Sequence, residues 1–392
     1  MSSEDKFGDY IKEIYLHGLN GELPSLPLET NALEAAAAEA MEERSAGYIA
    51  AAAGSELTMK FNREAFDRWR IVPRMLRDVS ERSHETAILG TKMPAPVMLA
   101  PIGVQTLAHE DGELASASAA AAVGLPFIAS TAADRTLEDI AFANGDAERW
   151  FQLYWTNDDD ITASMVRRAE AAGYKAIVIT VDTFIPGWKT RDLQQAWLPF
   201  VNGIGVANFF SDPVFRGSLE KTPEEDPGMA TGHYAGSYIN PALTWDRIDW
   251  LRQHTSLPIL IKGIQHPDDA REAIRIGVDG IVVSNHGGRQ VDGAIASLDA
   301  LPAVAEAIGG KMPVIFDSGI RTGSDIVKAL ALGADAVLLG RPYIWGLALE
   351  GQAGVEKVLK ATLADYDLAM ALSGFNSPKE LTPEALSESP KG

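Results

Sequence analysis

The sequence contains no cysteine in 392 residues. A disulfide framework, a thiolate metal site and a cysteine nucleophile are therefore excluded, and the composition fits a reducing cytoplasm. No run of 18 uncharged apolar residues occurs, and the opening MSSEDKFGDY lacks the basic start and apolar core of a signal peptide. We expect a soluble, cytoplasmic protein without membrane attachment, in which redox chemistry needs a bound cofactor.

Basic side chains are scarce relative to acidic ones. The chain has 34 Lys and Arg against 54 Asp and Glu, a formal charge of −20. Such a charge repels phosphate backbones and anionic lipids, so we expect no nucleic-acid partner and no membrane partner. The remaining partners are a small molecule or another protein, and for the latter we expect a homo-oligomer, a tetramer or an octamer.

Short apolar runs alternate with alanine-rich helical stretches from residue 96 onward. Each run is continuously apolar, which is typical of parallel strands buried on both faces. The runs are 96–100 (PVMLA), 125–130 (LPFIAS), 150–154 (WFQLY), 176–182 (AIVITVD), 258–262 (PILIK), 280–284 (GIVVS), 313–317 (PVIFD) and 336–340 (AVLLG).

This pattern predicts an α/β fold, a (β/α)8 TIM barrel over residues 96–345. The competing fold, a doubly wound open sheet, should carry a GxGxxG turn after an early strand, and none is present. We expect one structural domain with a helical N-terminal extension over 1–95, including helices near 32–40 and 47–54 that cover the barrel bottom or its mouth. A lid over about 184–240 should follow the fourth strand, and a helical tail should occupy 346–392.

Polar residues follow the predicted strands, where the active sites of such barrels lie. The last two strand ends, FDSGIRTG and GRPYIWG, bring glycines, backbone N–H groups, Arg321 and Arg341 to the place where these barrels bind phosphate. A phosphorylated ligand is indicated. The competing interpretation is that both arginines pair with surface acids of this acidic protein.

The stretch SNHGGRQ after the sixth strand carries His286 and Arg289 in a single glycine-rich turn. A histidine is suited to act as a base near neutral pH, and an arginine fork binds a carboxylate in two places. Asp182, at the end of the fourth strand, could stabilise the imidazolium or simply cap a turn. A base at His286 and a carboxylate-binding arginine at Arg289 together indicate that the substrate is a carboxylic acid.

At these residues the sequence resembles the FMN-dependent L-2-hydroxy acid oxidases and dehydrogenases along nearly its whole length. The resemblance rests on FQLYW, TVDT, IKGI, SNHGGRQ, DSGIRTG and GRPYIWG. Within the family, the lactate 2-monooxygenase branch is most similar, judged from GDY, VPRML, APIGV, GWKTRDL, DPVF, KGIQHPDDA and the long segment after the fourth strand.

The resemblance implies FMN as cofactor and no metal. It implies that His286 is the base, that Asp182 stabilises its charged form, that Arg289 binds the carboxylate with Tyr48 and Tyr154, and that Lys262 lies at the N1 and C2-oxygen edge of the flavin. The residues implied to hold the ring and ribityl chain are Pro101, Ile102, Gly103, Ser130, Gln152, Thr180 and Ser284. Those implied for ribityl and phosphate are Asp317, Gly319, Arg321, Gly340 and Arg341.

Two positions bear on the substrate. Lys189 stands where the family usually has arginine, so either carboxylate binding is weaker or Arg191 replaces it. Ala132 stands where plant glycolate oxidases have tryptophan, and with Gly103 it leaves room for at least a methyl group and for oxygen.

We therefore expect oxidation of a small L-2-hydroxy acid, foremost L-lactate, with O2 as acceptor. A monooxygenase would yield acetate, CO2 and water, whereas an oxidase would release the 2-oxo acid and H2O2. A dehydrogenase that reduces a quinone or cytochrome usually has a membrane segment or haem domain, and a non-catalytic phosphate-binding barrel would not require the base, aspartate and arginine.

Overall fold

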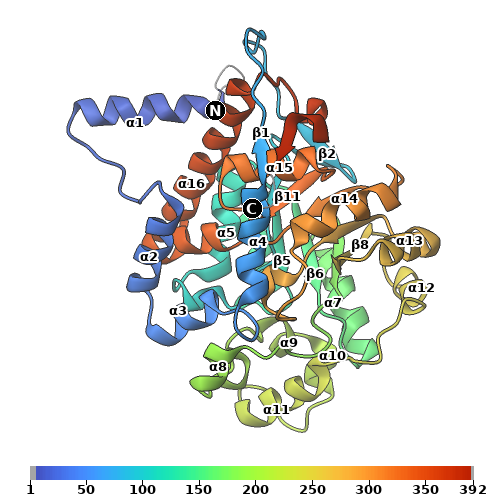
Figure 1. Ribbon diagram of the computed structural model, residues 1–392. Coiled ribbons are helices and arrows are strands. Elements are labelled where there is room, and N and C mark those ends of the chain that lie inside the picture. The colour runs from blue at the N-terminus through green and yellow to red at the C-terminus, as the bar shows by residue number, and fades with distance from the viewer. Residues whose placement is uncertain (1–5, 390–392) are drawn as a thin grey trace.

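The computed structural model describes residues 6–389 and is built around a closed parallel barrel (Figure 1). Around the barrel the strands follow the order β10-β11-β4-β5-β6-β7-β8-β9. They span Val97–Leu99 (β4), Phe127–Ser130 (β5), Arg149–Leu153 (β6), Ile177–Thr180 (β7), Ile259–Ile264 (β8), Gly280–Val283 (β9), Val314–Phe316 (β10) and Ala336–Leu339 (β11). The prediction of a (β/α)8 barrel is confirmed. The ends of the expected extension and tail, 1–5 and 390–392, lie outside the described residues.

The alternation of side chains along each strand builds two separate cores. One residue from the middle of every strand points into the barrel, where a cluster forms from Met98, Ile128, Trp150, Val178, Leu260, Val282, Ile315 and Leu338. Its neighbours, such as Phe151 and Ile177, point outward into the larger core beneath the helices. Because both faces are buried, the strands read as continuous apolar runs in the sequence.

A hairpin closes the amino-terminal end of the barrel. Its strands are β2 (Thr86–Ile88) and β3 (Thr91–Met93), and Ile88 and Met93 join the interior cluster. The Thr91 hydroxyl accepts a hydrogen bond of 2.8 Å from Trp150 Nε1. With this end plugged, the opposite end is the one open to a ligand.

Helices cover the outside of the barrel. They are α5 (Gly112–Val123), α6 (Leu137–Asn144), α7 (Asp159–Ala171), α13 (Pro267–Ile276), α14 (Ser297–Ile308), α15 (Gly323–Ala331) and α16 (Arg341–Leu372), the last interrupted by non-helical backbone at Glu350 and Gly351. Among residues 6–389, no helix has the length and apolar character that a bilayer crossing requires.

The long segment between β7 and β8 is folded into short helices, not an irregular excursion. These are α8 (Thr190–Gln194), η3 (Pro199–Asn202), α9 (Ala207–Phe210), α10 (Pro213–Gly217), α11 (Pro227–Tyr238) and α12 (Arg247–Arg252). Rings of Phe200, Phe209, Phe215, Tyr234 and Tyr238 pack together and hold them. Helices α8 to α11 group at one end of the barrel beside α3 (Figure 1).

The segment before the barrel contains more structure than its alanine-rich stretches indicate. It forms η1 (Phe7–Asp9), α1 (Tyr10–Leu19), α2 (Thr30–Ala40), α3 (Glu43–Ala50), α4 (Leu57–Arg68) and β1 (Trp69–Ile71). The helix expected over 47–54 therefore begins earlier and ends at Ala50. After α16 come η5 (Pro378–Glu380), η6 (Pro383–Ala385) and β12 (Leu386–Glu388), a strand that pairs antiparallel with β1. The N-terminal extension and the C-terminal tail are thus joined in one small sheet.

Asp367, buried on α16, ties three segments together. Its carboxylate accepts hydrogen bonds from Gly8 N (2.8 Å) and from Arg82 Nε and Nη2 (2.7 and 2.9 Å), and it lies 2.8 Å from His84 Nε2. The side chain of Asp367 is 1% exposed. Its loss would leave a buried arginine without a counter-charge.

We expect Asp367→Ala to lower the free energy of unfolding by about 3 kcal/mol, as breaking a buried ion pair does. Asp268→Ala is the control, because Asp268 pairs with Arg271 at an exposed surface and its loss should cost under about 0.5 kcal/mol. Denaturant unfolding of both variants tests this. Equal stabilities would show that the Asp367 cluster does not hold the chain ends.

Candidate functional site

A cavity opens at the carboxyl ends of the barrel strands, and most of the residues predicted for the site line it. These are Tyr48, Pro101, Ile102, Gly103, Ser130, Tyr154, Lys262, His286, Arg289, Asp317, Gly319, Arg321, Gly340 and Arg341. Tyr48 comes from α3, so the N-terminal extension reaches the mouth of the barrel. Tyr48 lines the cavity, so its role is not only to pack within an alanine-rich helix.

Five predicted residues lie outside this lining; Lys189 is one of them, and the other four belong to the strands or their carboxyl ends. Ser284 accepts a hydrogen bond of 2.9 Å from Lys262 Nζ, and Asp182 contacts His286. Gln152 Oε1 accepts a hydrogen bond from Ser130 Oγ, and Thr180 on β7 lies opposite Lys262 on the neighbouring strand β8. They support the lining side chains from the strands below.

His286 and Asp182 form a partly buried pair. His286 Nδ1 lies 2.8 Å from Asp182 Oδ1, and the Thr183 hydroxyl lies 3.2 Å from the same nitrogen. Burial lowers the pKa of His286 below its ordinary 6.5, although Asp182 opposes this. Burial raises the pKa of Asp182, but the charges of His286 and Lys262 and the hydrogen bonds from His286 and Thr183 together outweigh burial and lower the pKa. A neutral imidazole is therefore held by an ionised carboxylate, with Nε2 left to accept a proton.

One glycine lets Asp182 approach the barrel wall. Gly263 adopts a φ of +115°, at an irregularity in the pairing of β8 with β9. A Cβ at this position would lie 2.8 Å from Asp182 Cβ. Any other residue would push the carboxylate away from His286.

Lys262 is a buried ammonium with two acidic neighbours. Its Nζ lies 3.2 Å from Asp317 Oδ2, and the side chain is 5% exposed. Burial alone would lower the pKa of Lys262, but the charges of Asp317 and Asp182 outweigh it and raise the pKa. The cation therefore persists at neutral pH and can stabilise negative charge that develops in the cavity.

Three arginines line the cavity without carboxylate partners among residues 6–389. Arg289 Nη1 donates to Tyr48 O (3.0 Å) and Ala51 O (2.6 Å), and Arg341 Nη2 donates to Ala51 O (3.1 Å). Arg321 lies 4.9 Å from the Trp345 ring centroid. Burial, and then the charges of Arg289 and Arg321, lower the pKa of Arg341 to about 9. An anion at this end of the cavity would relieve that repulsion.

The side chains of Lys189 and Arg191 approach different groups. Lys189 Nζ lies 5.7 Å from the Tyr48 ring centroid, and Arg289 Cζ lies 5.0 Å from the same centroid. Arg191 Nη2 instead pairs with Glu56 Oε2 at 2.6 Å. Lys189 does not line the cavity but lies next to Tyr48 and Arg289, whereas Arg191 is held away from them.

Several residues that line the cavity were not predicted from the sequence, namely Ile49, Val104, Phe200, Ser318, Ile320 and Ile344. Phe200 comes from the segment between β7 and β8, where nothing in the local sequence marks it. Ser318 was detectable, because it lies between Asp317 and Gly319 in a motif already chosen. Its hydroxyl accepts a hydrogen bond of 2.9 Å from Gly287 N.

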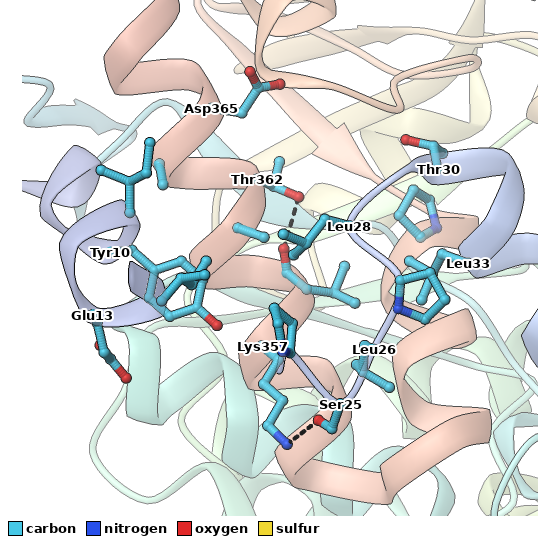
Figure 2. Close-up of a pocket in the computed structure, with 18 of the residues that line it drawn as sticks. Tyr10, Glu13, Ser25, Leu26, Leu28, Thr30, Leu33, Lys357, Thr362 and Asp365 are labelled. Carbon is cyan, nitrogen blue, oxygen red and sulfur yellow. Dashed lines mark hydrogen bonds between the residues drawn. The ribbon is translucent and has the colours of Figure 1, made fainter. Parts of the chain in front are cut away.

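A second, larger cavity of about 640 Å³ lies between α1, residues 22–33 and α16, and Figure 2 shows part of its lining. Its walls carry Leu26, Leu28 and Leu33, and Lys357 Nζ donates to Ser25 Oγ (2.8 Å). Arg321 lines both cavities. The His286–Asp182 pair and Lys262 belong to the barrel cavity, so the larger cavity is not where we place the chemistry.

Comparison with known proteins agrees with the barrel cavity. The family model of FMN-dependent dehydrogenases matches residues 37–388. The chain belongs to this family. It is 45% identical to the L-lactate oxidase of Lysinibacillus sphaericus (93% of this chain, 94% of that protein) and 44% identical to an FMN-dependent alpha-hydroxy acid dehydrogenase of Penicillium citrinum (95% and 93%). A crystal structure of mandelate oxidase with (S)-4-hydroxymandelic acid matches with a TM-score of 0.82 at 37% identity, over 92% of this chain and 98% of that one.

The members of this family use FMN, and the cavity of this FMN-dependent 2-hydroxy acid oxidoreductase fits that cofactor. Gln152 Oε1 accepts hydrogen bonds from Ser130 Oγ (3.1 Å) and Thr131 N (3.2 Å), which fixes the amide. Its Nε2 is buried and has no partner among the described residues. A carbonyl oxygen of a bound ring would satisfy this donor, and Arg321 and Arg341 suit a phosphate.

FMN should copurify without a covalent bond, since the chain has no cysteine to form a thioether. We expect Arg341→Ala and Arg321→Ala each to raise the FMN dissociation constant about 10- to 100-fold, the loss of one charge-assisted hydrogen bond. Arg271→Ala, on an exposed part of α13, is the control. Fluorescence titration of the apoprotein measures the constants. Full flavin occupancy in the Arg321 and Arg341 double variant would overturn the phosphate assignment.

Proposed function

We propose that this chain is a lactate 2-monooxygenase, which converts L-lactate and O2 to acetate, CO2 and water. The single observation that carries the chemistry is the His286–Asp182 pair at a cavity that also contains Arg289, which has no carboxylate partner among the described residues. When bound, FMN would supply the two-electron acceptor for oxidation at C2 of the hydroxy acid and the reductant for O2. The 2-oxo acid and peroxide formed in this way must stay together for decarboxylation to follow.

The protein residues supply binding and proton transfer. Arg289 binds the substrate carboxylate, assisted by the hydroxyls of Tyr48 and Tyr154. Burial raises the pKa of Tyr154, so its hydroxyl keeps its proton and can donate a hydrogen bond. His286 Nε2 takes the proton of the C2 hydroxyl, and Asp182 stabilises the imidazolium through Nδ1.

A small side chain on the substrate fits the lining. A Cβ at Gly103 would overlap the backbone oxygen of Ala132, so this glycine allows a close backbone contact and not added room. The small side chain of Ala132 lines the cavity together with Tyr154, Phe200 and Val104. This favours L-lactate over larger acids. The second candidate is an oxidase that releases the 2-oxo acid and H2O2, and the 45% identity to an L-lactate oxidase favours it.

His286→Ala should keep FMN and bind a carboxylate inhibitor, yet its flavin should be reduced by L-lactate at least ~100-fold more slowly, as loss of a positioned base predicts. In wild type the rate should fall as the pH drops through a midpoint below 6.5, because protonated His286 cannot accept a proton. Asp182→Asn should show a smaller loss and a still lower midpoint, since the carboxylate raises the pKa of His286. Anaerobic stopped-flow measures these rates, and normal reduction in His286→Ala would remove it from the mechanism.

Lys189 provides a test of product retention. If its charge holds the anionic 2-oxo acid, Lys189→Met should release more H2O2 per lactate consumed, while flavin reduction falls less than in Arg289→Met. Arg191→Met is the matched control, because Arg191 pairs with Glu56. Burial and the charge of Arg289 lower the pKa of Lys189 to about 8, so wild type should also leak more peroxide above this pH.

Acetate, 2-oxo acid and peroxide are measured at fixed oxygen. An unchanged product ratio in Lys189→Met would refute the retention role. One H2O2 released per lactate by wild type would replace the monooxygenase with the oxidase.

A further inference from the structure

The turn that carries His286 and Arg289 has an unfavourable backbone. His286, Gly287 and Gly288 have φ values of +58°, +66° and +79° in succession. A non-glycine residue in this left-handed region costs about 1 kcal/mol, and such conformations persist only where the surroundings enforce them. The contacts that enforce this turn therefore determine where the histidine and the arginine point.

The Ser284 and Ser318 hydroxyls supply two of these contacts, to His286 N and Gly287 N, and a pair of buried amides supplies a third. Asn62 on α4 and Asn285 at the start of the turn are 2% and 5% exposed. Asn62 Nδ2 donates to Asn285 Oδ1 (2.8 Å), and Asn285 Nδ2 donates to Asn62 Oδ1 (2.7 Å). This reciprocal pairing fixes the orientation of both amide groups.

The fixed amide in turn holds the backbone of the turn. Asn285 Oδ1 also accepts a hydrogen bond from Gly288 N (3.1 Å), and Asn285 Nδ2 donates to Ile295 O (3.2 Å). Asn62 Oδ1 accepts from Ser297 N (3.1 Å), which anchors the same pair to the start of α14. Without Asn62, the buried Asn285 amide would lose two partners and could rotate, leaving Gly288 N with only its hydrogen bond to Asn285 O (3.1 Å).

We propose that Asn62, in the N-terminal extension, is a positioning residue that sets His286 and Arg289 together through Asn285. The inference rests on the function proposed above, because it assigns Asn62 an effect on the proton acceptor and on the carboxylate clamp at once. Asn62 does not line the cavity and contacts neither reacting group.

The chain offers a matched control on the same helix. Thr58 is fully buried on α4, and its hydroxyl donates to Val291 O (2.8 Å) and accepts from Ala294 N (2.9 Å). These bonds hold the segment immediately after the turn, not the turn itself. Thr58→Val thus removes two partly buried hydrogen bonds from the same helix without touching Asn285.

The experiment compares FMN-loaded Asn62→Ala, Asn62→Asp and Thr58→Val. Asn62→Asp keeps the volume but places two acceptor oxygens face to face, so it decides the question if Asn62→Ala fails to fold. Both Asn62 variants should reduce flavin about 10- to 100-fold more slowly, the scale of a misplacement near 1 Å. They should also bind oxalate, a carboxylate probe, at least about tenfold more weakly, while Thr58→Val lowers Tm and leaves both quantities within about twofold.

Asn62 variants that lose only Tm, as Thr58→Val does, would overturn the positioning role while the proposed function stands. A parallel His286→Ala measurement separates the two claims. If that variant reduces flavin normally, the proposed function fails and this inference fails with it.

Discussion

Pairing of β11 with β4 closes the sheet into a barrel, and the rest of the structure depends on this closure. Val337, Leu338 and Leu339 pair in parallel with Val97, Met98 and Leu99, so no strand edge is left and all eight carboxyl ends meet at one rim. The interior is filled by one side chain from each strand and plugged by the β2–β3 hairpin. Polar residues that are far apart in the sequence are therefore brought to a single cavity, where Lys262, His286 and Arg289 lie together.

The charge of the cavity lining is opposite in sign to the net charge of the protein. A chain of net charge −20 places a buried lysine and three arginines around one site. The backbone carbonyls of Tyr48 and Ala51 stabilise part of this positive charge by accepting hydrogen bonds from Arg289 and Arg341. The barrel alone would thus be an incomplete site. The N-terminal extension supplies Tyr48, these carbonyls and, through Asn62, hydrogen bonds to the turn that carries His286 and Arg289.

Strand positions and most lining residues were predictable because each depends on a local pattern: an apolar run, followed by a polar end. SNHGGRQ and DSGIRTG could be read in the same way. Phe200 could not, since its place depends on aromatic packing with Tyr234 and Tyr238 in the segment after β7. Helix α4 was missed as well, because its buried face combines Thr58 and Asn62 with Phe66, so its pattern is weakly apolar. The choice between Lys189 and Arg191 required a third residue, Glu56, whose position no sequence pattern gives.

The central claim is that this cavity oxidises an L-2-hydroxy acid by direct transfer of two electrons to FMN. Anaerobic titration of the purified protein with L-lactate, followed by the visible absorption of the flavin, tests it most directly. We expect one equivalent of L-lactate per bound FMN to bleach the flavin completely and to yield one equivalent of 2-oxo acid. D-lactate should leave the flavin absorption unchanged. A flavin spectrum that L-lactate leaves unchanged, in protein fully loaded with FMN, would contradict the claim that lactate is the substrate.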